Sequence, residues 1–125
     1  MTHPNLTHLH ELAELDRLLA ESAAHPVLIF KHSYSCGTSA EALDELMAHA
    51  DVQPAAARIA IVTVQTDRAI SNAVTARLGV RHETPQALLV RDGKVVWFAS
   101  HFRVTSDEIS RAIARAAVQA DDHAH

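Results

Sequence analysis

The sequence predicts an α/β fold with a mixed four-stranded sheet that carries helices on both faces. Three observations lead to this fold class. Segments of helical periodicity alternate with short apolar runs in the order α-βα-βα-ββ-α. The first two strand candidates are apolar throughout, as in strands covered on both faces. An Asp92-Gly93 turn then joins two later strand candidates into a hairpin. At 125 residues, the chain is expected to form one domain over 1–125.

An amphipathic helix is expected first. Its inner face would be formed by four leucines at helical spacing, Leu9, Leu12, Leu15 and Leu19. Thr7 precedes them and is expected to cap the helix. His25-Pro26 ends this segment, and residues 27–30 form a strand. A second helix is expected over about 36–50, so the only cysteine, Cys36, would lie at a strand-to-helix junction.

A second strand and a third helix follow the turn-forming pair Gln53-Pro54. The strand covers the β-branched run 59–64, and a right-handed crossover would place it parallel to the first strand and next to it. The helix would begin after Asp67, which is expected to cap it, and end at Gly79.

The remaining elements are a hairpin and a final helix. Residues 86–91 and 94–99 read as antiparallel strands, and Trp97 is expected in the core. Thr105 to Glu108 has the spacing of a capping box at the start of the last helix. Residues 121–125 are expected to form a frayed tail.

Composition narrows the classes of function. The net charge is −4, without a basic cluster or an aromatic ladder, which argues against a nucleic-acid partner. The apolar runs are far shorter than the roughly 20 residues of a membrane span, so no membrane role is expected. The first residues lack the pattern of a secretory signal, and we expect a cytoplasmic protein. A single cysteine has no internal disulfide partner, so it would remain a thiol in that reducing compartment.

Cys36 is the candidate catalytic residue. At the first turn of a helix, free backbone amides and the helix dipole favour a thiolate over a thiol. Lys31 and His32 are expected to add positive potential, and Gly37 suits a helix start. Three hydroxyls, of Ser35, Thr38 and Ser39, are candidate donors to the sulfur. The alternative is an inert, buried structural cysteine.

A second candidate element precedes the third strand, at Thr84-Pro85. Proline removes a ladder donor and, in the cis form, turns the chain sharply. The predicted topology places Pro85 opposite Cys36, which would leave the Thr84 backbone free to pair with a peptide-like ligand. An ordinary loop proline is the alternative.

The end of the fourth strand lies at this same edge of the predicted sheet. Candidate ligand contacts there are Ser100, His101 and Arg103. The N-terminus of the last helix, at 105–107, could receive a ligand carboxylate. The alternative for this segment is a solvated loop.

The chain contains ten histidines, which raises the question of a metal site. The pairs His8-x-His10 and His123-x-His125 lack further ligands at fixed spacing and are interpreted as surface residues. The predicted fold gathers His32, His82 and His101 at the cysteine end of the sheet. A Cys/His metal site is conceivable there, but we favour electrostatic tuning and ligand contact, with no metal.

These residues carry a resemblance to known proteins. Residues 30–50 and Thr84-Pro85 resemble the thioredoxin-like fold. The segments IFKHSYSCGTS, SNAVTARLGVRHETPQALLVRDGKVVWFASH and VTSDEI resemble monothiol bacilliredoxins of the YtxJ type. That resemblance implies a redox enzyme that removes bacillithiol from S-bacillithiolated proteins. Cys36 would be the nucleophile and bacillithiol the co-substrate, with no permanently bound cofactor. Gly37 departs from the proline that often follows the cysteine in such proteins.

Ser39 stands where a Cys-x-x-Cys protein has its resolving cysteine. A second low-molecular-weight thiol or a separate reductant would therefore have to reset a charged Cys36. Two alternatives remain. Residues 36–39, CGTS, also resemble the Cys-Gly-Phe-Ser motif of monothiol glutaredoxins, which bridge an iron–sulfur cluster. A non-enzymatic thioredoxin-like adaptor is the other. The residues alone do not distinguish bacillithiol from glutathione or coenzyme A as the low-molecular-weight thiol. Only the family resemblance favours bacillithiol.

Overall fold

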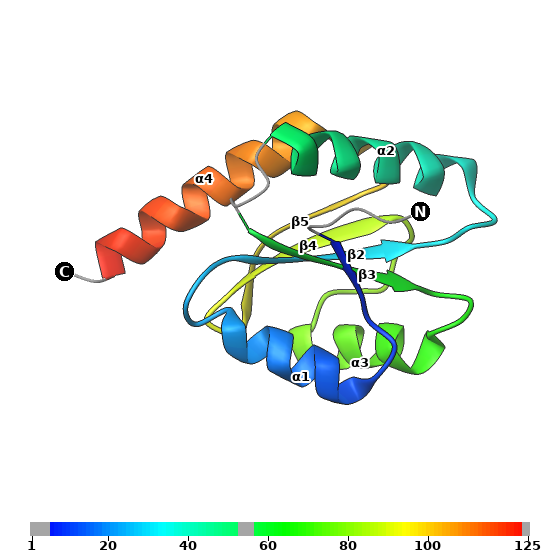
Figure 1. Ribbon diagram of the computed structural model, residues 1–125, viewed down its shortest axis with the longest axis horizontal. Helices are drawn as coiled ribbons and strands as arrows, with labels where there is room; N and C mark the ends of the chain where they lie inside the picture. Colours follow the sequence, from blue (N-terminus) through cyan, green and yellow to red (C-terminus); the bar gives the residue numbers. More distant parts are fainter. Residues whose placement is uncertain (1–5, 53–56, 124–125) are drawn as a thin grey trace.

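The computed structural model describes residues 6–52 and 57–123 and has a mixed sheet of five strands (Figure 1). The strands are β1 Leu6–His8, β2 Val27–His32, β3 Arg58–Thr63, β4 Gln86–Arg91 and β5 Lys94–Ser100. The helices are α1 Leu12–Glu21, α2 Gly37–Val52, α3 Arg68–Leu78 and α4 Ser106–His123, with a short 3₁₀ turn, η1, over His101–Arg103. The strand order is β1-β3-β2-β4-β5.

The sheet confirms the predicted mixed topology. Strands β2 and β3 are parallel neighbours, and β4 runs antiparallel to β2. Strand β5 pairs with β4 through the predicted tight turn, where Asp92 and Gly93 have φ values of 55° and 72°. Positive φ at both central residues is the signature of a type I′ hairpin turn. Helices α2 and α4 cover one face and α1 and α3 cover the other (Figure 1).

The prediction of four strands was wrong by one edge strand. Strand β1 pairs in parallel with β3, with Leu6 opposite Ile59. Thr7 therefore lies in β1 and does not cap α1. Helix α1 begins at Leu12. Glu11 occupies its N-cap position, and the Glu11 N–H donates to the Glu14 carboxylate over 2.9 Å. A three-residue strand is too short to show a period of two, which explains why the pattern missed it.

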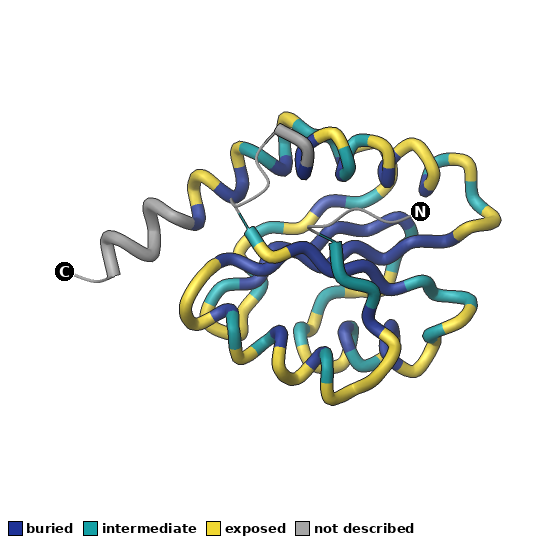
Figure 2. Tube along the Cα trace, in the orientation of Figure 1, coloured by how far each residue is buried: buried dark blue, intermediate teal, exposed yellow. Residues whose placement is uncertain are grey.

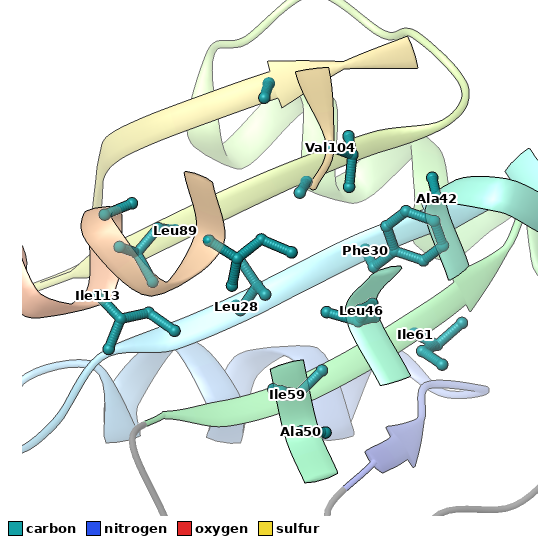
Figure 3. Close-up of a cluster of buried hydrophobic side chains, with 14 of the residues drawn as sticks. Leu28, Phe30, Ala42, Leu46, Ala50, Ile59, Ile61, Leu89, Val104 and Ile113 are labelled. Carbon is teal, nitrogen blue, oxygen red and sulfur yellow. The ribbon is translucent and has the colours of Figure 1, made fainter. Parts of the chain in front are cut away.

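Two apolar layers enclose the sheet, whose inner strands β2, β3 and β4 are buried along most of their length (Figure 2). The layer beneath α2 and α4 includes Leu28, Phe30, Leu46, Leu89 and Ile113 (Figure 3). The layer beneath α1 and α3 includes Val27, Ile29, Ile70, Val74 and Leu88. Adjacent β2 residues thus enter opposite layers, as the period of two requires. Trp97, predicted in the core, is partly buried against the first layer.

The helix ends agree with the sequence in part. Helix α3 ends at the predicted Gly79, whose φ of 70° is left-handed. Asp67 occupies the N-cap position of α3, but its side chain makes no capping hydrogen bond. Helix α4 is described as far as His123, and the expected fraying of the chain from Asp121 stays a prediction. The pair Gln53-Pro54 and residues 124–125 lie outside the described residues. No helix in the described ranges is long and apolar enough to cross a membrane.

Candidate functional site

Cys36 lies immediately before the first residue of α2, at the end of the turn that follows β2. Its carbonyl oxygen accepts from the Ala40 N–H over 3.2 Å, and its own N–H donates to the Ser33 carbonyl over 3.4 Å. The residue is only partly buried. The thiol therefore lies at the positive end of the α2 dipole and is open to a ligand.

Gly37, the first residue of α2, is exposed, and a Cβ built on it would meet no atom within 4 Å. No close approach of another group therefore requires glycine there. Proline is common at the first position of a helix, where the amide has no partner within the helix. The departure from the cysteine–proline pattern is thus compatible with the same local backbone.

A hydrogen-bonded network holds the loop that carries Cys36. The Ser39 hydroxyl, fully buried in the first turn of α2, accepts from the Ser33 N–H over 2.9 Å and lies 2.9 Å from His32 Nδ1. The Ser35 hydroxyl lies 3.2 Å from the Ser33 hydroxyl, and Gln65 Nε2 donates to both. We refer to His32, Ser33, Ser35, Ser39 and Gln65 as the cysteine-side network.

This network changes the interpretation of the serines. Neither the Ser35 nor the Ser39 hydroxyl forms a hydrogen bond with the sulfur in the described part of the chain; both hydroxyls contact the loop instead. Gln65 was missed by sequence reasoning. It lies just past the end of β3, and parallel neighbouring strands end at the same edge of a sheet. That placement was the signal that could have identified it.

His32 is buried at the end of β2, on the α2 side. Burial lowers its pKa, and the neighbouring His8 lowers it further. The neutral imidazole is therefore favoured in the folded protein. The prediction that His32 adds positive potential near Cys36 is not supported by this shift.

Lys31 lies one residue earlier and is fully buried on the α3 side. Its Nζ donates to the Thr75 hydroxyl over 2.7 Å and lies 3.0 Å from His82 Nδ1. Burial lowers the pKa of Lys31 to about 8. The ammonium thus contacts α3 and the segment before β4.

The Thr84–Pro85 peptide bond, in the segment before β4, is cis. The Pro85 carbonyl accepts from the His101 N–H over 3.0 Å, which continues the β4–β5 ladder by one step. Within the described ranges, Thr84 makes no backbone–backbone hydrogen bond. In register, Gln86 lies opposite both Lys31 on β2 and Ser100 on β5. The Thr84–Pro85 segment is therefore at the edge where β2 ends and the Cys36 loop begins.

We refer to Lys31, Thr75, His82 and Thr84 as the proline-side network. His82 is exposed, and its Nε2 lies 3.4 Å from the Thr84 hydroxyl. The pKa of His82 is lowered by burial first, then by the positive charges of Lys31 and Arg68, against a smaller opposing effect of Glu83. The imidazole beside Thr84 is therefore favoured in its neutral form.

A pocket of about 380 Å³ lies between the start of α2 and η1. Thr38 and His101 line it together with three carboxylates, those of Glu41, Asp44 and Glu45. Arg103 lines a second pocket, with Phe98 and Phe102. The structure thus brings Thr38 and His101 to one pocket and places Arg103 outside its lining.

The start of α4 does not offer the anion site that the sequence suggested. The Glu45 carboxylate already accepts from the Ser106 N–H over 2.9 Å, and the Thr105 hydroxyl caps the Glu108 N–H over 3.2 Å. One half of the predicted capping box, the bond to the Thr105 hydroxyl, is confirmed, whereas the Glu108 carboxylate accepts from Arg111. The Glu45 side chain of α2 occupies the position expected for a ligand carboxylate, because the helix terminus favours any nearby anion.

The histidines do not form a metal cluster in the part of the chain that the structure describes. No three His, Cys, Asp or Glu side chains gather there in a way that could hold an ion. His10 Nδ1 instead lies 3.1 Å from the Asp67 carboxylate. His32, His82 and His101 share one edge of the sheet but have different contacts, to Ser39, Lys31 and the Pro85 carbonyl respectively.

Solved structures with a similar chain path show the fold. A provisionally assigned oxidoreductase with a thioredoxin fold matches at a TM-score of 0.77 and 24% identity, over 86% of this chain and 92% of its own. Thioredoxin from Fasciola hepatica matches at 0.71 and 19%, over 88% and 98%. A mutant thioredoxin from Halobacterium salinarum matches at 0.69 and 20%, over 93% and 95%. These matches show that the chain has a thioredoxin fold, in which the single thiol lies at the start of α2.

The family is more specific than the fold. The sequence model described as monothiol bacilliredoxin BrxC matches residues 7–109. The chain therefore belongs to the monothiol bacilliredoxin family and is a thiol oxidoreductase. Its single cysteine fits monothiol chemistry, and its family implies chemistry related to bacillithiol.

Proposed function

We propose that Cys36 removes bacillithiol from mixed disulfides on other proteins. The observation that carries this proposal is the position of the only thiol, partly exposed at the start of α2, in a chain of the monothiol bacilliredoxin family. The Cys36 thiolate attacks the bacillithiol sulfur, and the disulfide bond of the substrate breaks. The target protein leaves as a thiolate and takes up a proton, and Cys36 carries the bacillithiol.

The second half of the reaction needs an external thiol. Ser39 occupies the position of a resolving cysteine, and its hydroxyl is buried and bonded within the cysteine-side network. A second bacillithiol thiolate therefore attacks the Cys36-bound bacillithiol. Cys36 leaves as a thiolate, and bacillithiol disulfide is the oxidised product. A separate thiol reductant can take the place of the second bacillithiol.

The Thr84–Pro85 segment is the proposed docking edge for the substrate. The Thr84 backbone has no backbone partner among the described residues, and the segment lies at the edge where β2 ends. A short extended stretch of the substrate can pair with it as an added strand. Thr38, Ser100, His101 and Arg103 remain predicted ligand contacts around this edge, with Thr38 and His101 sharing a pocket.

Intact mass spectrometry tests the transfer directly. A bacillithiolated test protein is mixed with the wild type and with Cys36→Ala, without added reductant. The wild type is expected to gain one bacillithiol while the test protein loses it, and Cys36→Ala is expected to gain none. Transfer from the glutathionylated test protein in place of the bacillithiolated one would overturn the choice of thiol. Equal transfer by both variants would overturn the role of Cys36.

The iron–sulfur alternative is tested on the same preparation. Anaerobic reconstitution with iron and sulfide is expected to leave the wild type colourless. A visible chromophore that is lost in Cys36→Ala would favour the cluster carrier instead. A non-enzymatic adaptor would be indicated by iodoacetamide alkylation of Cys36 that follows the pH profile of a free cysteine and by no transfer of bacillithiol.

A further inference from the structure

Lys31 is an unusual residue to find in the central strand of the sheet. Its side chain is fully buried on β2, and no carboxylate of the described residues pairs with it. Burying an ammonium without a counter-ion is unfavourable, and its two polar contacts offset only part of the loss of water. One of these contacts, His82, leads to the Thr84–Pro85 segment.

The contact between Lys31 and His82 determines the tautomer of the imidazole. A lysine ammonium has three donors and no acceptor, so His82 Nδ1, 3.0 Å from Nζ, must accept. A neutral imidazole that accepts at Nδ1 carries its proton on Nε2. The positive charge of Lys31 also opposes a second proton on the ring.

His82 Nε2 faces the docking edge. It lies 3.4 Å from the Thr84 hydroxyl, a long and weak contact that leaves the N–H able to reach a better acceptor. The residue is exposed, so an acceptor on a ligand can approach it. The charged groups that act on His82 are Lys31 from β2, Arg68 from α3 and Glu83 from the same segment.

The segment that carries His82 is fixed by contacts to two strands, from Lys31 of β2 and from Gln86 of β4. Gln86 Nε2 donates to the Arg81 carbonyl over 3.0 Å, and Gln86 lies opposite Lys31 in the β2–β4 register. Lys31 therefore holds the imidazole while its cross-strand neighbour holds the backbone one residue earlier. A fixed donor at the edge of a site is a means of orienting a ligand.

We propose that Lys31 is a positioning residue that fixes His82 as the Nε2–H tautomer, whose N–H then binds an oxygen acceptor of the docked mixed disulfide beside Thr84. This inference rests on the proposed function. The acceptor is either a carboxylate of bacillithiol or a backbone carbonyl of the target protein. Both present the same chemistry to a neutral imidazole donor.

Nitrogen-15 NMR of the histidine side chains tests the tautomer without any substrate. At pH 7, His82 of the wild type is expected to show a protonated Nε2 and an unprotonated Nδ1. Lys31→Met is expected to yield a mixture of tautomers, because Nδ1 loses its donor. The matched control Thr75→Val removes the other contact of Lys31 and is expected to keep the Nε2–H tautomer. An Nδ1–H tautomer or a charged imidazolium in the wild type would overturn the proposal.

Single-turnover transfer to Cys36 tests what the N–H binds. The amide of glutamine places its NH₂ near the position of Nε2, whereas that of asparagine places it near Nδ1. We therefore expect His82→Asn to slow transfer about tenfold and His82→Gln to stay within about threefold of the wild type. Equal rates for both variants and the wild type would show that the donor has no role.

Two substrates separate the two sources of the acceptor. One target peptide is linked by a disulfide either to bacillithiol or to cysteamine, which has no carboxylate. A loss for His82→Asn on the bacillithiol substrate alone assigns the acceptor to an oxygen of bacillithiol, and a loss on both assigns it to a peptide carbonyl. Failure of the wild type to accept bacillithiol would instead refute the proposed function, while the NMR result would still decide the tautomer.

Discussion

The last two residues of β2 lead to two networks on opposite faces of the sheet, and the networks differ in how well their polar groups are satisfied. His32 joins a compact set of hydroxyl and amide partners that hold the Cys36 loop. Lys31 places an ammonium against one hydroxyl and one imidazole, with no carboxylate among the described residues. The cysteine side is therefore built from neutral hydrogen bonds, and the proline side includes an unfavourable buried charge.

The difference suggests a division of tasks. A nucleophile needs a fixed position, and neutral hydrogen bonds to a loop supply it with little loss of stability. A docking edge must recognise a polar ligand, and functional sites commonly retain groups that reduce stability. Removal of the Ser39 hydroxyl and removal of the Lys31 ammonium should therefore change stability in opposite directions.

Removing the hydroxyl of Ser39 is expected to have the largest effect on stability. Ser39→Ala leaves the buried Ser33 N–H without its acceptor and His32 Nδ1 without its partner. We expect the free energy of unfolding to fall by about 1–3 kcal/mol in urea denaturation. The matched control is Ser35→Ala, an exposed residue of the same loop, with an expected loss below about 0.5 kcal/mol. Similar losses in both variants would show that the buried hydroxyl does not anchor the loop.

Replacing Lys31 is expected to have the opposite sign. Lys31→Met removes a buried ammonium and keeps a long apolar side chain, so the free energy of unfolding at pH 7 should rise by about 2 kcal/mol. The control Lys94→Met changes an exposed lysine at the start of β5 and is expected to be nearly neutral. A clear loss of stability for Lys31→Met would show that the ammonium stabilises the fold.

The same pair of proteins should differ in alkaline solution. Burial lowers the pKa of Lys31 from its ordinary 10.5 to about 8. Between these two values the unfolded chain still holds a proton on Lys31 that the folded protein has released. Because stability rises with pH wherever the unfolded state binds more protons, the free energy of unfolding should rise between these two pKa values. Below pH 8 both states are charged and the full penalty applies. Urea denaturation from pH 7 to 10 should show this rise in the wild type but not in Lys31→Met.

The sequence was sufficient for the order of the four α-helices and of four of the five strands and for the chemical class. It was insufficient for the contacts of the two networks. The Asp92-Gly93 turn, the Gly79 cap and the apolar run of β2 are local signals, and each appears in the structure as predicted. Strand β1 was missed because its three residues pair only with a distant segment.

The contacts of the site depend on which face each side chain takes and on distant partners. Lys31 and Ser35 were both identified as site residues, but their contacts were not. Lys31 contacts Thr75 and His82, and Ser35 contacts Gln65, all of which lie far along the chain. The start of α4 shows the same limit. The sequence predicts an anion site at its free amides, but in the folded protein Glu45 of α2 already accepts from the Ser106 N–H.

Proline at position 37 offers a smaller test on the cysteine side. Gly37→Pro places proline at the first position of α2, where a Cβ meets no other group. Fewer conformations of the unfolded chain should raise the free energy of unfolding by about 0.5–1 kcal/mol. Gly79→Pro, at a left-handed helix end, is the contrasting variant and is expected to destabilise, because proline requires a negative φ. A loss of stability in Gly37→Pro would mean that the Gly37 amide has a role in the loop.

Two glutamines allow the finest comparison, one in the cysteine-side network and one beneath the segment that carries His82. Gln65 Nε2 donates to the Ser33 and Ser35 hydroxyls, which contact each other, whereas Gln86 Nε2 donates to the Arg81 carbonyl. In both residues Oε1 is buried and lacks a partner within the described part of the chain. Leucine would remove that unsatisfied oxygen, which offsets part of the lost hydrogen bonding.

The two leucine variants should therefore differ in stability, because the loss of the amide donor leaves different groups without a partner. After Gln65→Leu, the two serine hydroxyls still satisfy each other, and stability should stay within about 0.3 kcal/mol of the wild type. After Gln86→Leu, the Arg81 carbonyl loses its donor, and a loss of about 0.5–1 kcal/mol is expected in urea denaturation. Gln65→Leu should instead alter the rate of Cys36 alkylation, because it frees the loop next to the thiol. The reverse order of stabilities would mean that the cysteine loop, rather than the segment before β4, depends on its glutamine.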